Sequence, residues 1–188
     1  DYLKEHKRKL SNRADKKRRV TAFWWNYTFP LHREYYHLPK IWCSYRSKVN
    51  AFVLDDSSDY IGLTNTTIIF GTNPKYSLKY LLAILNAKLF AFRYRSIAKQ
   101  TGSGVFEYVP NAVGRFPIPE ADSKIQNEFA LLVDKMLDLK QKEYGEQNPQ
   151  VKKIISRQID GVDNMIDKAV YKLYGLTKED IKIVEQIQ

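Results

Sequence analysis

The residues that could take part in catalysis are few in this 188-residue chain, and their spacing fits no common reaction. A metal-dependent nuclease needs acidic residues and a lysine that converge from two strands, so that Mg²⁺ and a water are positioned. The single Glu-x-Lys sequence is Glu5-His6-Lys7, which lies among charged helix formers with no acidic strand before it. We therefore interpret it as a coincidence of composition.

The histidines and the cysteine do not form a metal-binding motif. His6, His32 and His37 are scattered, and Cys43 lies in a predicted strand, where core packing is expected. A single cysteine also excludes an internal disulfide and fits a reducing cytosol. Because no apolar run reaches the roughly 20 residues that cross a bilayer, we expect a soluble protein located in the cytoplasm.

Two loop motifs are weak candidates for a ligand site. Asp55, Asp56 and Asp59 offer carboxylates to a cation, but acidic turns with serine are common in loops. Gly102 and Gly104 are not followed by the lysine and hydroxyl residue of a phosphate-binding loop. The Asn/Asp-Pro-Pro-Tyr/Phe loop of a methyltransferase that acts on an exocyclic amine is also missing. We therefore predict no catalytic residue, metal or cofactor in this chain.

The strongest chemical signal is an excess of positive charge near the N-terminus. The net charge is +10; residues 1–50 hold 13 Lys and Arg against 4 Asp and Glu, residues 51–120 hold 7 against 5, and residues 121–188 hold 11 against 12. A localised excess is typical of a surface that binds a polyanion, because cations that neutralise phosphates release condensed counterions. The same run also fits a solvated helix face, and composition does not distinguish nucleic acid from anionic lipid.

These cations have to be positioned by regular elements, and the first 120 residues predict a small sheet with packed helices. Charged helix formers predict a surface helix from Tyr2 to about Arg19. The aromatic run from Ala22 to Phe29 predicts a buried strand or an aromatic wedge that ends at Pro30. Three further strands are predicted between turn-rich segments, at Lys40–Tyr45, Asn50–Leu54 and Thr66–Phe70.

Helices dominate the rest of the chain. Ser77 predicts the N-cap of a helix from Leu78 to about Ile97, followed by a glycine-containing loop and a short strand at Val105–Val109. Three later helix starts are predicted, at a capping box of Ser123 with Gln126, at Asn148-Pro149 for a helix that ends at Gly175, and at Thr177. We predict an α+β fold: a small mixed sheet with packed helices in residues 1–120, then long C-terminal helices in residues 121–188.

Four sequence blocks in order resemble a known family: Pro39-Lys40-Ile41-Trp42, Ala51-Phe52 leading to Asp55, the run from Tyr80 to Phe90, and Phe116-Pro117-Ile118-Pro119. Their order and spacing resemble the TaqI-like C-terminal specificity domain. The segment from Val170 to Leu176 is similar to the one that closes many single-chain restriction-modification enzymes of the type IIG kind. The resemblance covers roughly residues 38–188, and the first 37 residues match only loosely.

This resemblance implies a target recognition domain that reads bases in the major groove of double-stranded DNA. Long helices would link it to methyltransferase and nuclease domains of the same polypeptide, and the specificity subunits of type I systems are similar in plan. The whole protein would be a type II restriction endonuclease and adenine-specific DNA methyltransferase. S-adenosylmethionine and Mg²⁺ are implied only for those absent catalytic parts, and this chain alone is not an enzyme.

Under this interpretation the cations divide into two groups. A tight run of four offers charge more than geometry and is assigned to the DNA backbone: Lys16, Lys17, Arg18 and Arg19. A second group lies on two loops and is assigned to the groove: Arg46, Lys48, Arg93, Arg95, Lys99, Gln100, Thr101 and Ser103. Arginine and glutamine have the bidentate geometry for guanine and adenine edges, and glycines permit close backbone approach. The alternative for Arg93 and Arg95 is that they solvate a helix end.

Two other functions remain open at this point. The chain could be a protein-interaction module, or a specificity subunit, that docks a methyltransferase through its C-terminal helices. It could also be a small stand-alone enzyme, which the missing motifs argue against. The DNA-binding interpretation depends on the cations of the N-terminal half and of the glycine loop sharing one surface.

Overall fold

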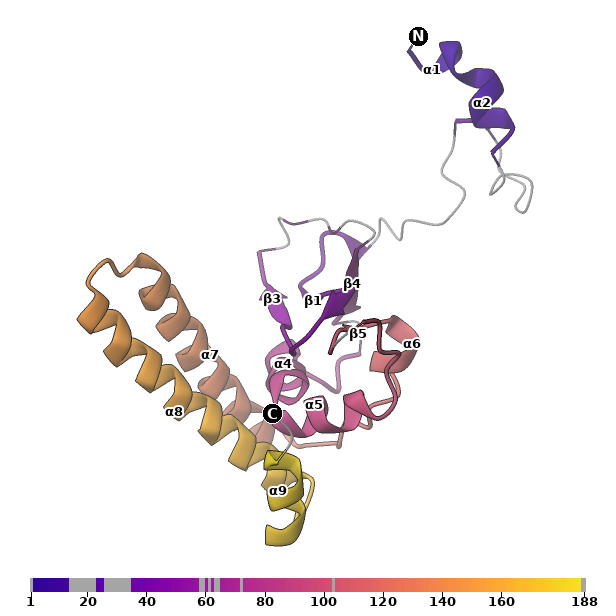
Figure 1. Ribbon diagram of the computed structural model, residues 1–188. Coiled ribbons are helices and arrows are strands. Elements are labelled where there is room, and N and C mark those ends of the chain that lie inside the picture. Colours follow the sequence, from indigo (N-terminus) through magenta and orange to yellow (C-terminus); the bar gives the residue numbers. More distant parts are fainter. Residues whose placement is uncertain are drawn as a thin grey trace. The chain divides into compact units, whose positions relative to one another are not determined.

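The computed structural model describes residues 2–13, 23–25, 35–57, 60, 62, 65–71, 73–102 and 104–186. The chain divides into two compact units, residues 1–37 and residues 38–188 (Figure 1). The larger unit contains both the sheet and the C-terminal helices. The division into domains 1–120 and 121–188 stays a prediction.

In the first unit, the predicted surface helix is present as two short pieces. These are α1 (Tyr2–Glu5) and α2 (Lys7–Ser11). The part of the aromatic run that the structure describes is a turn, in which Phe23 stacks on Trp25 with ring centroids 4.7 Å apart and both rings remain about half exposed. A buried strand is therefore wrong for these residues, because the rings pack on each other in a turn. The predicted backbone cations Lys16–Arg19 lie outside the described residues.

The sheet of the second unit has one strand in each of the three predicted regions, although the second strand begins at Val53 and not at Asn50. Its order is β3 (Val53–Asp55), β1 (Lys40–Ser44) and β4 (Thr66–Phe70), and both pairings are antiparallel. The α+β class is confirmed, although these strands form an antiparallel sheet instead of a mixed one. The connection from β1 to β3, residues 45–52, is shorter than the dozen or more residues of a parallel crossover, so these two neighbours pair antiparallel.

One face of the sheet packs on a helix pair. Ile41 and Cys43 of β1 are buried, and burial raises the pKa of the Cys43 thiol to about 12, as expected for a core cysteine. Below the sheet lie α4 (Leu78–Asn86) and α5 (Lys88–Arg95), with the predicted Ser77 hydroxyl accepting from the Tyr80 amide at α4.

The single helix expected from Leu78 to Ile97 is broken at Ala87, whose backbone is extended. Asp167 explains the break, because its carboxylate accepts from the Lys88 amide at 2.9 Å and so caps α5 from another helix. The same carboxylate lies 3.0 Å from Lys88 Nζ. The short helix α6 (Pro110–Val113) follows later in the chain.

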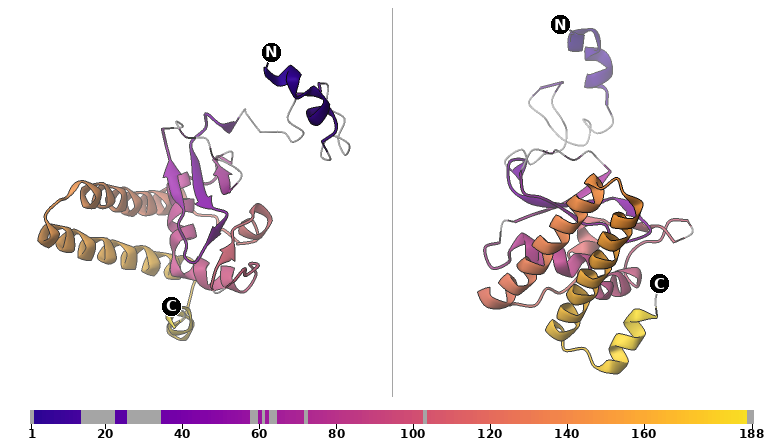
Figure 2. Two further views of the ribbon diagram at one scale, coloured as in Figure 1. Left: turned by 45° about the horizontal axis from the view of Figure 1, so that its top comes forward. Right: turned by 90° about the vertical axis from the view of Figure 1, so that its left-hand side faces the viewer.

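The C-terminal third forms an antiparallel helix pair, α7 (Ser123–Gly145) and α8 (Pro149–Leu173), followed by α9 (Lys178–Glu185) (Figure 2). The predicted caps at Asn148 and Thr177 are confirmed. The capping box at Ser123 is wrong, because Asp122 caps α7 by accepting from the Ile125 amide. Among the described helices, none is long and apolar enough to cross a bilayer.

The Gln126 side chain, which forms no capping box with Ser123, joins the starts of two helices. Its Oε1 accepts from the Ser77 amide at 2.8 Å, and its Nε2 donates to the Lys75 carbonyl at 2.7 Å. Because Ser77 is the N-cap of α4, the side-chain amide of Gln126 fixes the beginning of α7 against the beginning of α4. The helix pair is thereby fastened to the helix beneath the sheet.

A buried ion pair joins two strands of the sheet. Lys40 lies opposite Asp55 in the register, with Nζ 2.8 Å from Oδ2 and side chains 1% and 3% exposed. Burial alone would raise the pKa of Asp55, but hydrogen bonds from Lys40, Ser57 and Trp42 lower it to about 2. The Asp55 carboxylate of the acidic turn therefore has a structural role, in which it joins β3 to β1.

We predict that Lys40→Met lowers the free energy of unfolding by about 3 kcal/mol, because it leaves the buried Asp55 carboxylate without its cation. Urea unfolding followed by tryptophan fluorescence measures the change. The control is Lys153→Met on the exposed surface of α8, which should stay within about 0.5 kcal/mol of the original protein. Equal effects of the two substitutions would contradict a stabilising role for the pair.

Asp55 also predicts an acid-dependent loss of stability. Its pKa falls from about 3.9 in an unfolded chain to about 2 in the folded one, so the carboxylate stabilises the fold fully above its unfolded pKa. The difference in unfolding free energy between the original protein and Asp55→Asn should be constant above about pH 5 and shrink as the pH falls from about 4 to about 2. A difference that does not change over this range would refute the assignment.

Candidate nucleic-acid interface

A narrow ribbon joins the two loops that carry the predicted groove residues. Strand β2 (Arg46–Ser47), in a segment expected to be a loop, pairs antiparallel with β5 (Phe106–Glu107). On the other edge of β5, Gln100 bridges Phe106, and the Glu107 amide donates to the Lys99 carbonyl at 3.0 Å. Residues 99–107 therefore form a hairpin with β5 as the central strand of the ribbon. The short strand expected at Val105–Val109 is confirmed as β5.

The tip of this hairpin depends on glycine. Gly102 and Gly104 have φ values of +69° and +74°, in the left-handed region that other residues avoid. A Cβ atom at either position would meet no atom within 4 Å. These glycines are therefore required for the backbone conformation of the turn, while the space around them is open to a ligand.

The side chains at the base of the ribbon converge on one carboxylate. Glu107 Oε1 accepts from Arg46 Nη2 at 2.7 Å and from Arg46 Nε at 3.2 Å, and Oε2 lies 3.5 Å from Lys99 Nζ. We call these three residues the Glu107 cluster. The Glu107 side chain is 6% exposed, whereas those of Arg46 and Lys99 are 59% and 73% exposed. The hydrogen bond from Arg46 lowers the pKa of Glu107, which keeps the carboxylate ionised.

The cluster unites the two sequence loops and adds a residue that sequence reasoning missed. Arg46 and Glu107 are 61 residues apart, and no local motif connects them. The one available signal was an acidic residue directly after a glycine loop, in a region otherwise rich in cations. Lys48 directly follows the end of β2 and is exposed.

The remaining hairpin residues differ in their exposure. Gln100 is exposed, and its Nε2 lies 3.4 Å from the Gly102 carbonyl. Thr101 donates its amide to the Val105 carbonyl at 2.8 Å, while its hydroxyl is buried and has no hydrogen-bond partner in the described part of the chain. Ser103 lies outside the described residues. Gln100 is thus the more accessible of the two described candidates at the tip.

Arg93 and Arg95 lie in the last turn of α5, outside the Glu107 cluster. Nη1 of Arg93 donates to the Ser96 hydroxyl at 2.9 Å, and this hydroxyl donates to the Arg93 carbonyl at 2.7 Å. These contacts favour the alternative interpretation, in which the arginines solvate the end of the helix. Burial raises the pKa of Tyr108 to about 12, and the nearby charge of Arg95 opposes that rise.

An aromatic stack supports the ribbon from inside. The Tyr94 hydroxyl of α5 donates to the Glu107 carbonyl at 2.8 Å in the buried core. The Tyr94 ring stacks on Tyr108 with centroids 4.7 Å apart and on Phe90 with centroids 5.2 Å apart. The Tyr108 hydroxyl donates to Asn50 Oδ1 at 3.0 Å. The backbone of Glu107 is therefore fixed to α5, so the cluster rests on a rigid base.

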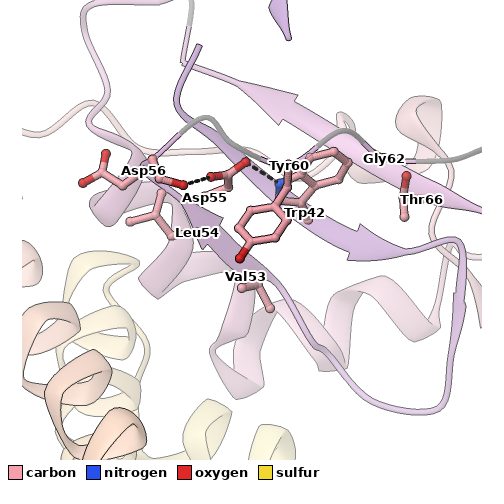
Figure 3. Close-up of a pocket in the computed structure, with 9 residues that line it drawn as sticks. Trp42, Val53, Leu54, Asp55, Asp56, Tyr60, Gly62 and Thr66 are labelled. Atoms are coloured by element: carbon pink, nitrogen blue, oxygen red, sulfur yellow. Dashed lines mark hydrogen bonds between the residues drawn. The ribbon is translucent and has the colours of Figure 1, made fainter. Parts of the chain in front are cut away.

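Two hollows lie near the sheet. A polar one beside Arg46 is lined by Ser44, Tyr45, Arg46 and Asn65. A second, largely apolar one lies on the sheet face opposite α4, between Trp42, Val53 and Tyr60, where the Trp42 indole donates to Asp55 (Figure 3). Among the residues that the structure describes, no three His, Cys, Asp or Glu side chains are arranged to hold a metal ion.

We predict that Tyr94→Phe lowers the free energy of unfolding by about 1 to 2 kcal/mol, because the buried Glu107 carbonyl loses its donor. The Glu107 amide should also exchange with solvent faster, as the hairpin loosens. Chemical unfolding and hydrogen exchange measure the two effects. Tyr144→Phe, on the exposed surface of α7, is the matched control and should change neither quantity. Unaltered stability and exchange in Tyr94→Phe would show that the hydroxyl does not support the ribbon.

Comparison with known families agrees with the resemblance seen in the sequence. The family model described as the TaqI-like C-terminal specificity domain matches residues 1–118. A search of the curated proteins finds no match to the chain. The matched region differs from the expected range of 38–188, since it includes the first 37 residues and ends before α7. Because the match spans well over half of the chain, the chain belongs to the TaqI-like C-terminal specificity domains and is a DNA-recognition domain of a restriction-modification enzyme.

Proposed function

We propose that this domain binds a specific sequence in double-stranded DNA and directs methyltransferase and nuclease domains of the same polypeptide, in an enzyme of the type II class. The observation that carries the proposal is the Glu107 cluster, in which exposed cations from two segments meet at the base of a projecting hairpin. The hairpin at residues 99–107 has two strands, and the major groove of B-DNA, which is about 12 Å wide, admits a two-stranded β-ribbon.

Affinity and specificity come from different side chains in this proposal. Lys48 and Lys99 are exposed point charges suited to phosphates, which fix the position of the domain on the duplex. Arg46 and Gln100 have planar donor groups suited to base edges. The glycines at 102 and 104 allow the hairpin backbone to approach the DNA closely. Lys16–Arg19 contribute further backbone contacts.

Catalysis is assigned to other parts of the polypeptide. S-adenosylmethionine would serve the methyltransferase domain and Mg²⁺ the nuclease domain, and the chain described here would supply recognition. The helix pair is a suitable link, because exposed apolar side chains occur along both helices, among them Leu131 of α7 with Ile154 and Met165 of α8. This observation also favours the second candidate function, a module that docks a methyltransferase through α7 and α8.

The first test is binding to duplex DNA. The chain should select a defined sequence from a pool of randomised duplexes, and the logarithm of its affinity should fall linearly with the logarithm of the salt concentration. Lys99→Ala should weaken binding to all duplexes and reduce the salt slope by about one, because one phosphate contact is lost. Fluorescence anisotropy measures both quantities.

The matched control is Lys153→Ala, which removes the same charge from the exposed start of α8 and should alter the slope much less. Binding that is absent or insensitive to salt would overturn the proposal. A stable complex with an isolated methyltransferase domain in the absence of DNA, combined with no duplex binding, would instead establish the docking function.

A further inference from the structure

The contacts of Arg46 use one edge of its guanidinium and leave the other edge available. Nε and Nη2 both point to Glu107 Oε1, at 3.2 and 2.7 Å. A guanidinium carries five N–H donors in a fixed plane. The remaining pair of parallel donors, one on Nη1 and one on Nη2, forms the end of the side chain and makes no hydrogen bond to another described residue.

The orientation of this free edge is fixed from two sides. Glu107 is nearly buried and its backbone is held by Tyr94, so its carboxylate is a rigid acceptor. The guanidinium also lies over the Tyr45 ring, with Cζ 5.7 Å from the centroid. A long side chain that is 59% exposed normally samples several rotamers, and these two contacts restrict Arg46 to few of them before any ligand arrives.

Arg46 borders a polar hollow that offers room for a base edge. The hollow is lined by Ser44, Tyr45, Arg46 and Asn65, and Asn65 is itself exposed. Two parallel N–H donors match the O6 and N7 acceptors of guanine in the major groove, whereas adenine presents one donor and one acceptor there. Lys99 keeps Glu107 charged from the other oxygen without competing for Oε1.

We propose that Arg46 reads a guanine in the target sequence through Nη1 and Nη2, and that Glu107 is the positioning residue that orients it. This inference rests on the proposed function and names the base that one side chain of the interface recognises. A methionine at position 46 would keep an unbranched side chain but no N–H donor, so it could not contact O6 or N7. Loss of the dependence on N7 at one guanine, with the other phosphate contacts retained, therefore reports on Arg46.

The test begins with the duplex sequence that the chain selects from a randomised pool. Each guanine of that sequence is replaced in turn by 7-deazaguanine, which lacks N7, or by inosine, which keeps O6 and N7 but lacks the minor-groove amino group. At one guanine, 7-deazaguanine should weaken binding about fivefold or more, whereas inosine should have little effect. That pattern identifies recognition in the major groove.

Protein variants then assign this guanine to Arg46. Arg46→Met, which has no N–H donor, should bind the unmodified duplex about 5- to 150-fold more weakly and become indifferent to 7-deazaguanine at that position. Glu107→Gln should lose much of the same discrimination while its affinity for unrelated duplexes is maintained or increased, because a negative charge is removed. Glu120→Gln is the matched control: it removes a carboxylate from an exposed pair with Lys75 and should retain full discrimination.

Three results would overturn the inference. The first is that no guanine of the selected sequence depends on N7, or that Arg46→Met keeps the dependence. If the chain still binds one sequence selectively, the proposed function would stand. The second is that Glu107→Gln discriminates as well as the original protein, which would remove the positioning role. The third is that no duplex is bound selectively, which would also overturn the proposed function.

Discussion

The antiparallel pairing of β2 with β5 is the contact on which the candidate interface depends. Each strand has two residues, so the pairing contributes little stability by itself, and its persistence depends on what fixes β5. Tyr94 binds the Glu107 carbonyl, and the Tyr108 amide donates to the Tyr45 carbonyl at 2.7 Å. The Thr67 hydroxyl donates to the Tyr108 carbonyl and so connects this ribbon to β4. The ribbon is therefore held in place by the core of the larger unit.

The charge balance of the Glu107 cluster explains how an ion-paired group can still attract DNA. A buried carboxylate is costly unless cations and hydrogen bonds compensate the loss of hydration. Arg46 and Lys99 supply this compensation, but two cations exceed the charge of one carboxylate, and both are largely exposed. The cluster therefore presents a net positive charge to solvent while its internal geometry is fixed. Fixed geometry favours discrimination between bases, and the residual charge favours attraction to phosphates.

The features that sequence predicted are those with local causes. The strands at Thr66–Phe70 and Lys40–Ser44 and the helix starts at Ser77, Asn148 and Thr177 follow from side-chain pattern and capping chemistry within a few residues. Two of the errors have distant causes. The break at Ala87 is stabilised by Asp167, which is 79 residues from the Lys88 amide it caps, and β2 exists because Glu107 lies opposite Arg46. The same limit applies to the site: its cations were visible as residue types, but the carboxylate that gathers them was not.

The attachment of the helix pair bears on how recognition is passed to the rest of the enzyme. Gln126 ties α7 to the N-terminus of α4, and Asp167 of α8 caps α5, whose Tyr94 holds the ribbon. A continuous set of hydrogen bonds thus runs from the helix pair through α5 to Glu107. The bonds of Asp167 and Tyr94 are half-buried and buried in one compact unit, so the ribbon and the base of the helix pair are expected to move as one body. Under the proposed function, a domain built in this way would hold the attached catalytic domains at a fixed distance from the recognised base, which a flexible connection would not achieve.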